Sequence, residues 1–307
     1  MPLYLVTGGA GFIGSHLTDA LLAEGHQVRV LDDLSTGHRH NLDPRAELVQ
    51  ADVADAEATH AAMAGAAGCF HLAAIASVQR GNEDWLGTHR ANQTGSIAVL
   101  DAARRHGRIP VVYASSAAVY GDLGGAVATE ASPTVPRTAY GADKLGSELH
   151  AAVAWGVHGV PTIGLRFFNV YGPRQDPASP YSGVISIFAH RIAAGLPITL
   201  HGDGQQTRDF VHVSDVVAHL LAALRHARVA QGAAVFNVCT GRETSVAALA
   251  ALLGEVAGVA PVVQHGAARA GDIRRSVGDL TRAAAALGLR AEVTIEAGLA
   301  TLRGQQS

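Results

Sequence analysis

Short apolar runs and longer helical patterns alternate along the first 170 residues of the chain. The short runs predict β-strands, whereas apolar residues spaced three or four apart predict amphipathic helices. Strands are expected at residues 3–7, 28–31, 47–51, 69–72, 111–115 and 162–168, and helices at residues 12–23, 84–105 and 138–155. Because strands that alternate with helices of this length need crossover connections, the pattern predicts an α/β fold with a parallel sheet.

The pattern changes after Asn169. Gly172-Pro173 and residues 176–183 are rich in glycine, proline and serine and predict a long loop. Helices are then expected at residues 184–194, 214–226 and 246–257, with a strand at 198–200. We therefore expect a first domain at residues 1–169 and a smaller α/β domain at 170–307, some of whose segments can return to the first.

Composition excludes several classes of protein. Hydrophobic residues make up 48% and charged residues 16% of the 307, so the chain is not disordered. A net charge of −3 argues against bulk binding to nucleic acid or to a membrane surface. Two cysteines make no disulfide framework. The first residues lack a secretory signal, and no apolar run is long enough to span a bilayer, so we expect a soluble, cytoplasmic protein.

A glycine-rich turn follows the first expected strand and opens the first helix. Gly8, Gly11 and Gly14 permit a tight turn and the close approach of a pyrophosphate to the helix N-terminus. Asp32 ends the second strand, 18 residues beyond Gly14, where a carboxylate can bind a ribose and repel a 2′-phosphate. This spacing favours NAD over NADP. The alternative is a structural turn with a helix-capping acid.

Two further segments follow expected strands. Asp52-Val53 comes after the third strand and residues 71–74 (His-Leu-Ala-Ala) after the fourth. An open parallel sheet places its ligand at the carboxyl ends of its strands, so both segments are expected at the cofactor. Asp52 is a candidate for hydrogen bonding an adenine amino group, and helix capping is its structural alternative.

Tyr140 and Lys144 lie four residues apart on an expected helix and therefore share one face. A lysine ammonium beside a phenol favours the phenolate, so we expect Lys144 to lower the pKa of Tyr140 and make it a general base. Ser116, just beyond a strand, can relay a proton to Tyr140. Each feature taken alone is equally compatible with an exposed Tyr/Lys pair and an ordinary turn.

These motifs together resemble the extended short-chain dehydrogenase/reductase family, and within it the NAD-dependent nucleotide-sugar epimerases and dehydratases. The resemblance rests on the glycine turn, on Ser-Ser-Ala-Ala-Val-Tyr-Gly at 115–121, on Tyr-x-x-x-Lys at 140–144, and on residues 166–174 and 207–213. It implies a Rossmann-type doubly wound sheet that binds NAD and a smaller domain that binds a nucleotide sugar. The cofactor contacts it implies are Gly8, Gly11, Phe12, Ile13, Gly14, Asp32, Asp52, Val53, Leu72, Ala73, Ala74, Asn92, Ser115, Tyr140, Lys144 and Phe167.

The branch of the family is indicated by Ala117-Ala118. The family's 4,6-dehydratases carry an Asp-Glu pair there, and its decarboxylases a glutamate at the second position. Two alanines do no acid/base work, so the resemblance implies a UDP-glucose 4-epimerase with Ser116, Tyr140 and Lys144 as catalytic residues. A UDP-glucuronate 4-epimerase stays open through Arg174, as do another nucleotide-sugar reductase or dehydratase and a catalytically silent nucleotide-binding protein.

The resemblance also implies a set of substrate contacts in addition to Ser116: Asn169, Val184, His201, Arg208, Arg269, Asp272 and Ser276. Asn169 is expected near the diphosphate, Arg208 and Arg269 on phosphate oxygens, Asp272 on the ribose and His201 on uracil. A surface ion pair with Asp209 or Asp215 is the alternative for Arg208. Ser276, if it walls the sugar pocket, is small enough to admit 2-acetamido sugars.

Other features of the sequence are less informative about function. The sixteen histidines are scattered, so no metal site is expected. Cys69 and Cys239 fall in apolar segments and are expected in the core. Trp85 and the helix that follows it are candidates for a homodimer interface, because the family often pairs this helix and the Tyr140 helix with their symmetry mates. Burial within the monomer is the alternative.

Overall fold

The structure is a computed structural model that describes residues 1–176, 183–268 and 272–303. Its main feature is a seven-stranded sheet with the order β11-β6-β5-β4-β1-β2-β3, in which all neighbours run parallel. The strands are β1 (Leu3–Thr7), β2 (Gln27–Asp32), β3 (Glu47–Gln50), β4 (Ala66–His71), β5 (Val111–Ser116), β6 (Thr162–Phe167) and β11 (Ala233–Val238). The strand order reverses between β1 and β4, as in a doubly wound Rossmann sheet, so the predicted fold class is confirmed.

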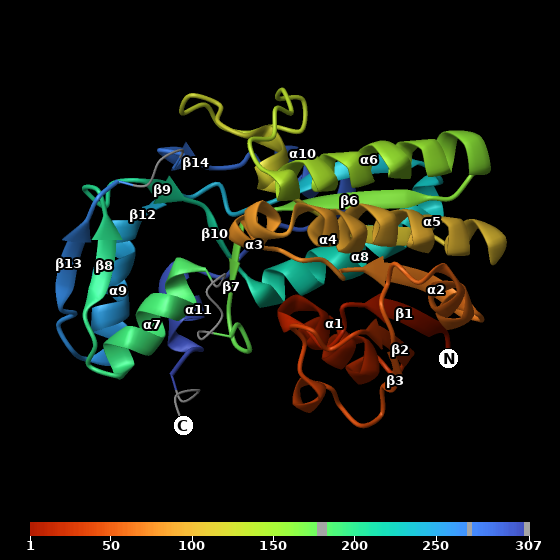
Figure 1. Ribbon diagram of the computed structural model, residues 1–307, viewed down its shortest axis with the longest axis horizontal. Coiled ribbons are helices and arrows are strands. Elements are labelled where there is room, and N and C mark those ends of the chain that lie inside the picture. Colours follow the sequence, from red (N-terminus) through yellow and green to blue (C-terminus); the bar gives the residue numbers. More distant parts are fainter. Residues whose placement is uncertain (177–182, 269–271, 304–307) are drawn as a thin grey trace.

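Helices cover both faces of this sheet (Figure 1). On one face, α2 (Ala56–Met63), α5 (Gly95–Arg105) and α6 (Ala139–His158) bury apolar side chains against β1, β2, β4 and β5. On the other face, α1 (Phe12–Ala23), α8 (Val213–Ala230) and α10 (Thr281–Leu287) do the same. Strand β11 and helices α8 and α10 therefore come from beyond Asn169 but pack on the main sheet.

A smaller part of the molecule lies beside the carboxyl ends of the strands, on the left in Figure 1. Helices α7 (Val184–Ala193), α9 (Val246–Ala257) and α11 (Ile295–Ala300) share a core with β8 (Ile198–His201), which pairs with β13 (Val263–Gly266). Short strands connect the two parts: β7 (Asn169–Tyr171) pairs with β10 (Phe210–His212), and β9 (Thr207–Arg208) lies between β12 (Thr244–Ser245) and β14 (Arg275–Ser276).

Helix α6 has capping residues at both ends. The Thr138 hydroxyl accepts a hydrogen bond from the Gly141 amide at 3.0 Å, which caps the N-terminus. At the other end Gly159 adopts a φ of +68°, a left-handed conformation that ends the helix at little steric cost. These two caps fix where Tyr140 and Lys144 lie along the helix.

The structure differs from the sequence predictions in two helices. The single helix expected at 84–105 is α4 (Trp85–His89), a π-helical turn (Arg90–Thr94) and α5. Its start is set by the Asp84 carboxylate, which accepts from the Gly87 amide. Helix α2 was not expected, and its N-cap is Asp55, whose carboxylate accepts from the amides of Glu57 and Ala58. Asp52 therefore does not cap this helix.

Three short turns complete the described elements: α3 (Val78–Glu83) and the 3₁₀ turns η1 (Arg39–Asn41) and η3 (Ala117–Tyr120). No helix within the described ranges is long and apolar enough to cross a membrane. Both cysteines of the chain, Cys69 and Cys239, are buried and unpaired, as expected for core residues.

Candidate active site

The carboxyl ends of β1, β2, β3, β4, β5 and β6 open into one cavity of about 560 Å³. It lies where the strand order reverses, which is where a doubly wound sheet binds its ligand. The residues predicted to contact the cofactor that line it are Gly8, Gly11, Phe12, Ile13, Gly14, Asp32, Asp52, Val53, Leu72, Ala73, Ala74, Ser115, Tyr140, Lys144 and Phe167. The fold thus brings together residues at or just beyond the ends of six strands and residues of α6.

The glycine turn has no room for side chains. A Cβ on Gly8, whose φ is +70°, would lie 2.6 Å from the Ala73 amide nitrogen, and a Cβ on Gly14 would collide with the Gly8 carbonyl oxygen. Gly11 is the N-cap of α1, and no described side chain caps the helix there. The first amides of α1 are therefore available to an anion at the positive end of the helix dipole, and this cradle fits the pyrophosphate of NAD.

Asp32 fixes the shape of the cavity beside the turn. Its carboxylate is 7% exposed and accepts hydrogen bonds from the amides of Ala10 and Leu34, both at 2.9 Å. Burial raises the pKa of this carboxyl, and the two amide donors act in the opposite direction. The carboxylate therefore ties the glycine turn to the loop after β2, where the ribose of NAD would lie.

Asp52 lies at the rim of the same cavity. One carboxylate oxygen accepts from the Ala54 amide at 2.8 Å, and the other lies 3.3 Å from Nη2 of Arg90. Arg90 lines the cavity as well. Asp52 is thus exposed to the cavity, in keeping with its predicted contact to adenine.

The three predicted catalytic residues meet on one wall of the cavity. The hydroxyls of Tyr140 and Ser116 are hydrogen-bonded to each other. The Lys144 ammonium donates to the Ala114 carbonyl at 2.9 Å and lies 5.8 Å from the centre of the Tyr140 ring. A phenol, a hydroxyl and an ammonium group therefore lie together on one wall of the cavity.

The pKa values of this pair differ from the sequence prediction. Burial raises the pKa of Tyr140, and the hydrogen bond from Ser116 only partly opposes it. Burial also lowers the pKa of Lys144 to about 8, against the attraction of the neighbouring Asp143. We predicted a lowered pKa for Tyr140, because of Lys144. In the structure without a bound cofactor this prediction is wrong: the pKa of Tyr140 is raised, because burial of the phenol outweighs the neighbouring groups.

Behind this wall is a buried polar network. His71 Nδ1 is 2.8 Å from the Thr7 hydroxyl and Nε2 is 3.1 Å from the Ser96 hydroxyl. Burial, together with the charge of Lys144, lowers the pKa of His71 to about 3, so this imidazole is neutral. Asn92, 1% exposed, binds the amide and carbonyl of Ile75, and the cavity lining, as far as the structure describes it, does not include Asn92. Its predicted contact with the cofactor stays a prediction.

The predicted substrate residues are more dispersed. Asn169 lines the cavity together with Ser116. Arg208 forms an ion pair with Asp272 at 2.5 Å and donates to the Ile273 carbonyl at 2.7 Å. The alternative that Arg208 pairs with Asp209 or Asp215 is wrong: the Asp209 carboxylate accepts from the Thr240 and Gly241 amides, and that of Asp215 from the Glu292 and Val293 amides.

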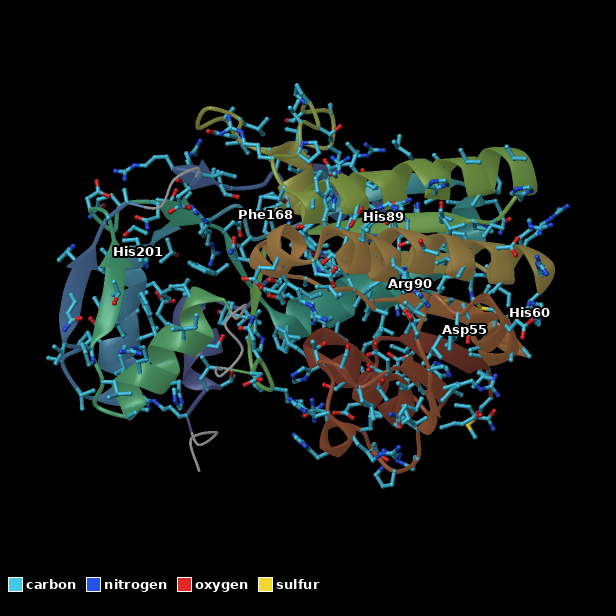
Figure 2. The ribbon with its side chains drawn as sticks, in the orientation of Figure 1. Asp55, His60, His89, Arg90, Phe168 and His201 are labelled. Carbon is cyan, nitrogen blue, oxygen red and sulfur yellow. The ribbon has the colours of Figure 1, made fainter. Side chains whose placement is uncertain are left out.

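Four further predicted substrate contacts do not belong to the described lining of the cavity or lie outside the described residues. Val184 begins α7 and packs on the core of the smaller part. His201 ends β8, with Nδ1 3.2 Å from the Ala267 carbonyl oxygen; Figure 2 shows it well away from Phe168, which lies between the two parts. Ser276 is paired in register with Arg208. Arg269 lies outside the described residues.

Sequence reasoning missed several residues of the lining. Asp33, Ser35, Thr36 and Gly37 come from the loop after β2, and Ile75, Arg80 and Gln175 from other loops and α3. The signal for the first group was present, because polar residues directly after a parallel strand lie at the ligand edge of the sheet. Among the described residues, no group of three or more metal-ligating side chains occurs.

Comparison with known proteins decides the family. A model of the NAD dependent epimerase/dehydratase family matches residues 4–239. The chain belongs to this family. The resemblance seen in the sequence motifs is therefore confirmed, and so is NAD as the cofactor.

Similar proteins within the family include several 4-epimerases of UDP-sugars. A UDP-glucose 4-epimerase of Mycolicibacterium smegmatis is 39% identical over 303 residues, which covers 96% of each chain. A UDP-glucose 4-epimerase of Thermotoga maritima, solved with UDP-glucose, is 35% identical with a TM-score of 0.92 and covers 97% of this chain and 96% of its own. A UDP-N-acetylglucosamine 4-epimerase of Methanobrevibacter ruminantium is 30% identical with a TM-score of 0.92, covering 98% and 96%.

Proposed function

We propose that the protein is an NAD-dependent UDP-hexose 4-epimerase that interconverts UDP-glucose and UDP-galactose. The observation that carries this proposal is the meeting of Ser116, Tyr140 and Lys144 on the wall of a dinucleotide cavity, directly before a turn that begins with Ala117-Ala118. Neither alanine can deliver or remove a proton, so eliminations and decarboxylations that need an acid there are disfavoured.

The chemistry follows from the placement of these side chains. Tyr140 takes the proton of the sugar C4 hydroxyl, and Ser116 is hydrogen-bonded to Tyr140 beside it. Lys144, held on the Ala114 carbonyl, supplies positive charge next to the phenol. Bound NAD supplies a reversible hydride acceptor for the C4 hydrogen. The resulting 4-keto sugar must then present its other face, so that C4 is inverted when the proton and hydride return.

Inversion at C4 requires that the nucleotide is bound tightly while the sugar stays free to turn in the site. Arg208 is already oriented by Asp272 and by the Ile273 carbonyl, and arginine matches the geometry of phosphate oxygens. We propose that Arg208 and Arg269 bind the diphosphate, with Asn169 on the diphosphate side and Asp272 on the ribose. In this division, residues 1–169 hold mainly NAD and residues 170–307 mainly the nucleotide sugar, with Val184 and His201 completing the second site.

The structure weakens the UDP-glucuronate alternative. That reaction calls for a basic group near the C6 carboxylate of the sugar, and Arg174 was the candidate. Arg174 forms an ion pair with Asp19 at 2.7 Å on α1, and the described lining of the cavity does not include it. A catalytically silent protein is also disfavoured, because the Ser116, Tyr140 and Lys144 constellation is complete.

The range of sugars depends on Ser276. We propose that this small residue, beside Arg208 in the β9–β14 pair, leaves space for a 2-acetamido group, so that UDP-N-acetylglucosamine is also a substrate. Good turnover of UDP-glucose with no C4 product from UDP-N-acetylglucosamine would refute this extension.

We also propose a homodimer. Leu149, Val153 and Val157 are 62%, 52% and 70% exposed at successive turns of α6, and Trp85 and Leu86 on α4 are 69% and 84% exposed. These helices lie side by side on one face of the molecule (Figure 1). An apolar stripe of this kind on a soluble enzyme is typical of an interface. Val153→Asp should halve the mass measured by sedimentation, and an unchanged mass would exclude this face.

The assay that tests the function needs no added cofactor, since NAD is regenerated in every cycle. The purified protein is incubated with UDP-glucose, UDP-N-acetylglucosamine or UDP-glucuronic acid, and the nucleotide sugars are separated by chromatography. We expect UDP-galactose to form from UDP-glucose. We also propose that the protein acts in the cytoplasm, in nucleotide-sugar metabolism and polysaccharide biosynthesis. The absence of any C4 product would contradict the proposal.

A further inference from the structure

Three successive turns of α6 bind three consecutive residues of β5. Tyr140, Lys144 and Glu148 lie four residues apart on the helix. Tyr140 is hydrogen-bonded to Ser116, and Lys144 donates to the Ala114 carbonyl at 2.9 Å. The third contact is made by the hydroxyl of Ser115, which donates to the Glu148 carboxylate at 2.5 Å. The strand end that carries Ser116 is thereby fixed to the helix that carries Tyr140 at three adjacent points.

Glu148 is itself held from the neighbouring strand. Arg166 on β6 donates to both of its carboxylate oxygens, at 2.9 Å and 2.7 Å, in a bidentate pair. Ser115 and Arg166 are direct partners in the β5–β6 register. All three residues are at most 8% exposed. Their positions are thus set by the sheet and not by surface rotamers.

The same arginine reaches the turn that follows Ser116. Arg166 Nη1 donates to the Tyr120 hydroxyl at 2.9 Å, and that hydroxyl donates to the Asn237 side chain at 2.6 Å. Tyr120 ends η3, the turn that begins directly after Ser116. The buried Arg166 guanidinium therefore contacts the chain on both sides of Ser116. Before Ser116 the contact runs through Glu148 to Ser115, and after Ser116 it is made directly with Tyr120.

A buried charge pair needs an explanation beyond packing. Well-packed apolar side chains would join a helix to a strand at no desolvation cost, so a buried ion pair is weak evidence for a role in stability alone. The described lining of the active-site cavity includes Ser115 but neither Glu148 nor Arg166, so neither of these two is a catalytic residue.

We propose that Glu148, together with Arg166 and Ser115, is a positioning device that holds the Ser116 hydroxyl beside the Tyr140 side chain. This inference rests on the proposed function only in that Tyr140 is taken as the base. Its effect would be felt in the proton step, because the Ser116 hydrogen bond is the contact that opposes burial and favours the phenolate of Tyr140.

The test compares Ser115→Ala with wild type. This variant removes one hydroxyl and leaves both Arg166–Glu148 hydrogen bonds in place. We expect kcat to fall on the order of 10-fold, as for a small misplacement of a reacting group, with the KM for the UDP-sugar within about twofold. We also expect the acid limb of the kcat–pH profile to move to higher pH, because Tyr140 loses part of its stabilised phenolate.

A matched control is available two turns before the end of the same helix. The buried Thr162 hydroxyl on β6 donates to the Ala151 carbonyl of α6 at 3.1 Å, which is also a strand-to-helix hydrogen bond. Thr162→Val should lower stability by a similar amount and leave the pH profile in place. Glu148→Gln serves as a second variant, which removes the carboxylate charge and should shift the profile in the same direction as Ser115→Ala.

A second readout separates this inference from the function. Phenolate titration of Tyr140 in the holoenzyme, by ultraviolet difference absorbance against Tyr140→Phe, needs no substrate. The other titratable groups near this end of α6 are Lys144, Asp143, the buried and neutral His71 and the cavity-lining Arg80 and Arg90, all unchanged in these variants. A raised Tyr140 pKa in Ser115→Ala supports positioning even if no UDP-sugar is turned over; an unchanged pKa and pH profile in a folded variant would overturn it.

Discussion

The two parts of the molecule are built in different ways. The dinucleotide part stands on seven parallel strands, and its functional residues follow directly at the strand ends. The smaller part, which we propose holds the nucleotide sugar, is built from strands of two to four residues, and its Arg208–Asp272 contact joins residues 64 positions apart. In the proposed function, the main sheet is therefore the frame for the chemical step, and the smaller part, held together at Arg208 by an ion pair, is the clamp for the nucleotide.

This difference suggests that substitutions in the two parts act on different steps. Changes at the sheet edge should alter the chemical step or cofactor retention and leave the nucleotide-sugar affinity nearly intact. Changes in the clamp should alter affinity for the nucleotide and leave the proton transfer intact. Four predictions test this contrast.

The largest effect is expected at Tyr140. Tyr140→Phe removes the base and keeps the ring, so kcat should fall by about 10³-fold or more, while UDP affinity measured by calorimetry stays within about twofold. Because the residue lies on the capped helix α6, the variant should fold normally by circular dichroism. Turnover close to wild type would remove Tyr140 as the base.

The next effect is expected in the clamp. Arg208→Ala should weaken UDP binding by about 10- to 100-fold, the range for loss of charge-assisted hydrogen bonds, with the pH dependence of kcat unchanged. Arg274→Ala is the matched control, since it removes an arginine nearby whose ion pair with Asp203 is exposed. We expect UDP affinity within about twofold of wild type for the control. Equal losses in both variants would mean that general positive charge, and not the position of Arg208, binds the diphosphate.

Cofactor choice should respond to Asp32. Asp32→Asn keeps an oxygen that can accept from the Ala10 or Leu34 amide but removes the negative charge. We expect roughly tenfold weaker retention of NAD and less discrimination against NADP, measured by reloading the stripped enzyme with each dinucleotide. Asp43→Asn, at an exposed pair with Arg45, is the control. Unchanged preference in Asp32→Asn would show that another group excludes the 2′-phosphate.

The smallest effect concerns stability in acid. The pKa of His71 is about 3 in the folded protein and 6.5 ordinarily, so below about pH 6.5 the unfolded chain binds a proton that the folded chain does not. Stability should therefore fall as the pH drops from 6.5 towards 3, by up to about 1.4 kcal/mol per pH unit from this group. His71→Gln should reduce that slope in urea unfolding, whatever its effect at neutral pH. An equal slope would assign the acid sensitivity to other groups.

Sequence patterns were informative where the physics is local. The glycine turn, the ends of α1 and the placement of Tyr140 and Lys144 on α6 depend on residues within a few positions, and the structure agrees with these predictions. The π-helical turn at Arg90–Thr94 was not predicted; Asn92 within it binds Ile75 in another segment, and such a contact leaves no local pattern in the sequence.

Pairings between residues far apart in the chain were harder to predict from the sequence. The Arg208–Asp272 pair and the Arg166–Glu148 pair each join separate elements, and no spacing in the sequence indicates which charges will meet. The pKa of Tyr140 was predicted in the wrong direction for a related reason: the sequence shows the neighbouring lysine but not the burial that outweighs it.

The most direct test of the central claim follows the hydrogen at C4. The purified enzyme, with no dinucleotide added, is incubated with UDP-glucose carrying deuterium at C4, and the UDP-galactose formed is analysed by mass spectrometry and NMR. If the hydride leaves and returns within one active site next to Tyr140, the product retains the deuterium at C4. Loss of the deuterium to solvent, or dependence on added NAD in every turnover, would contradict the account.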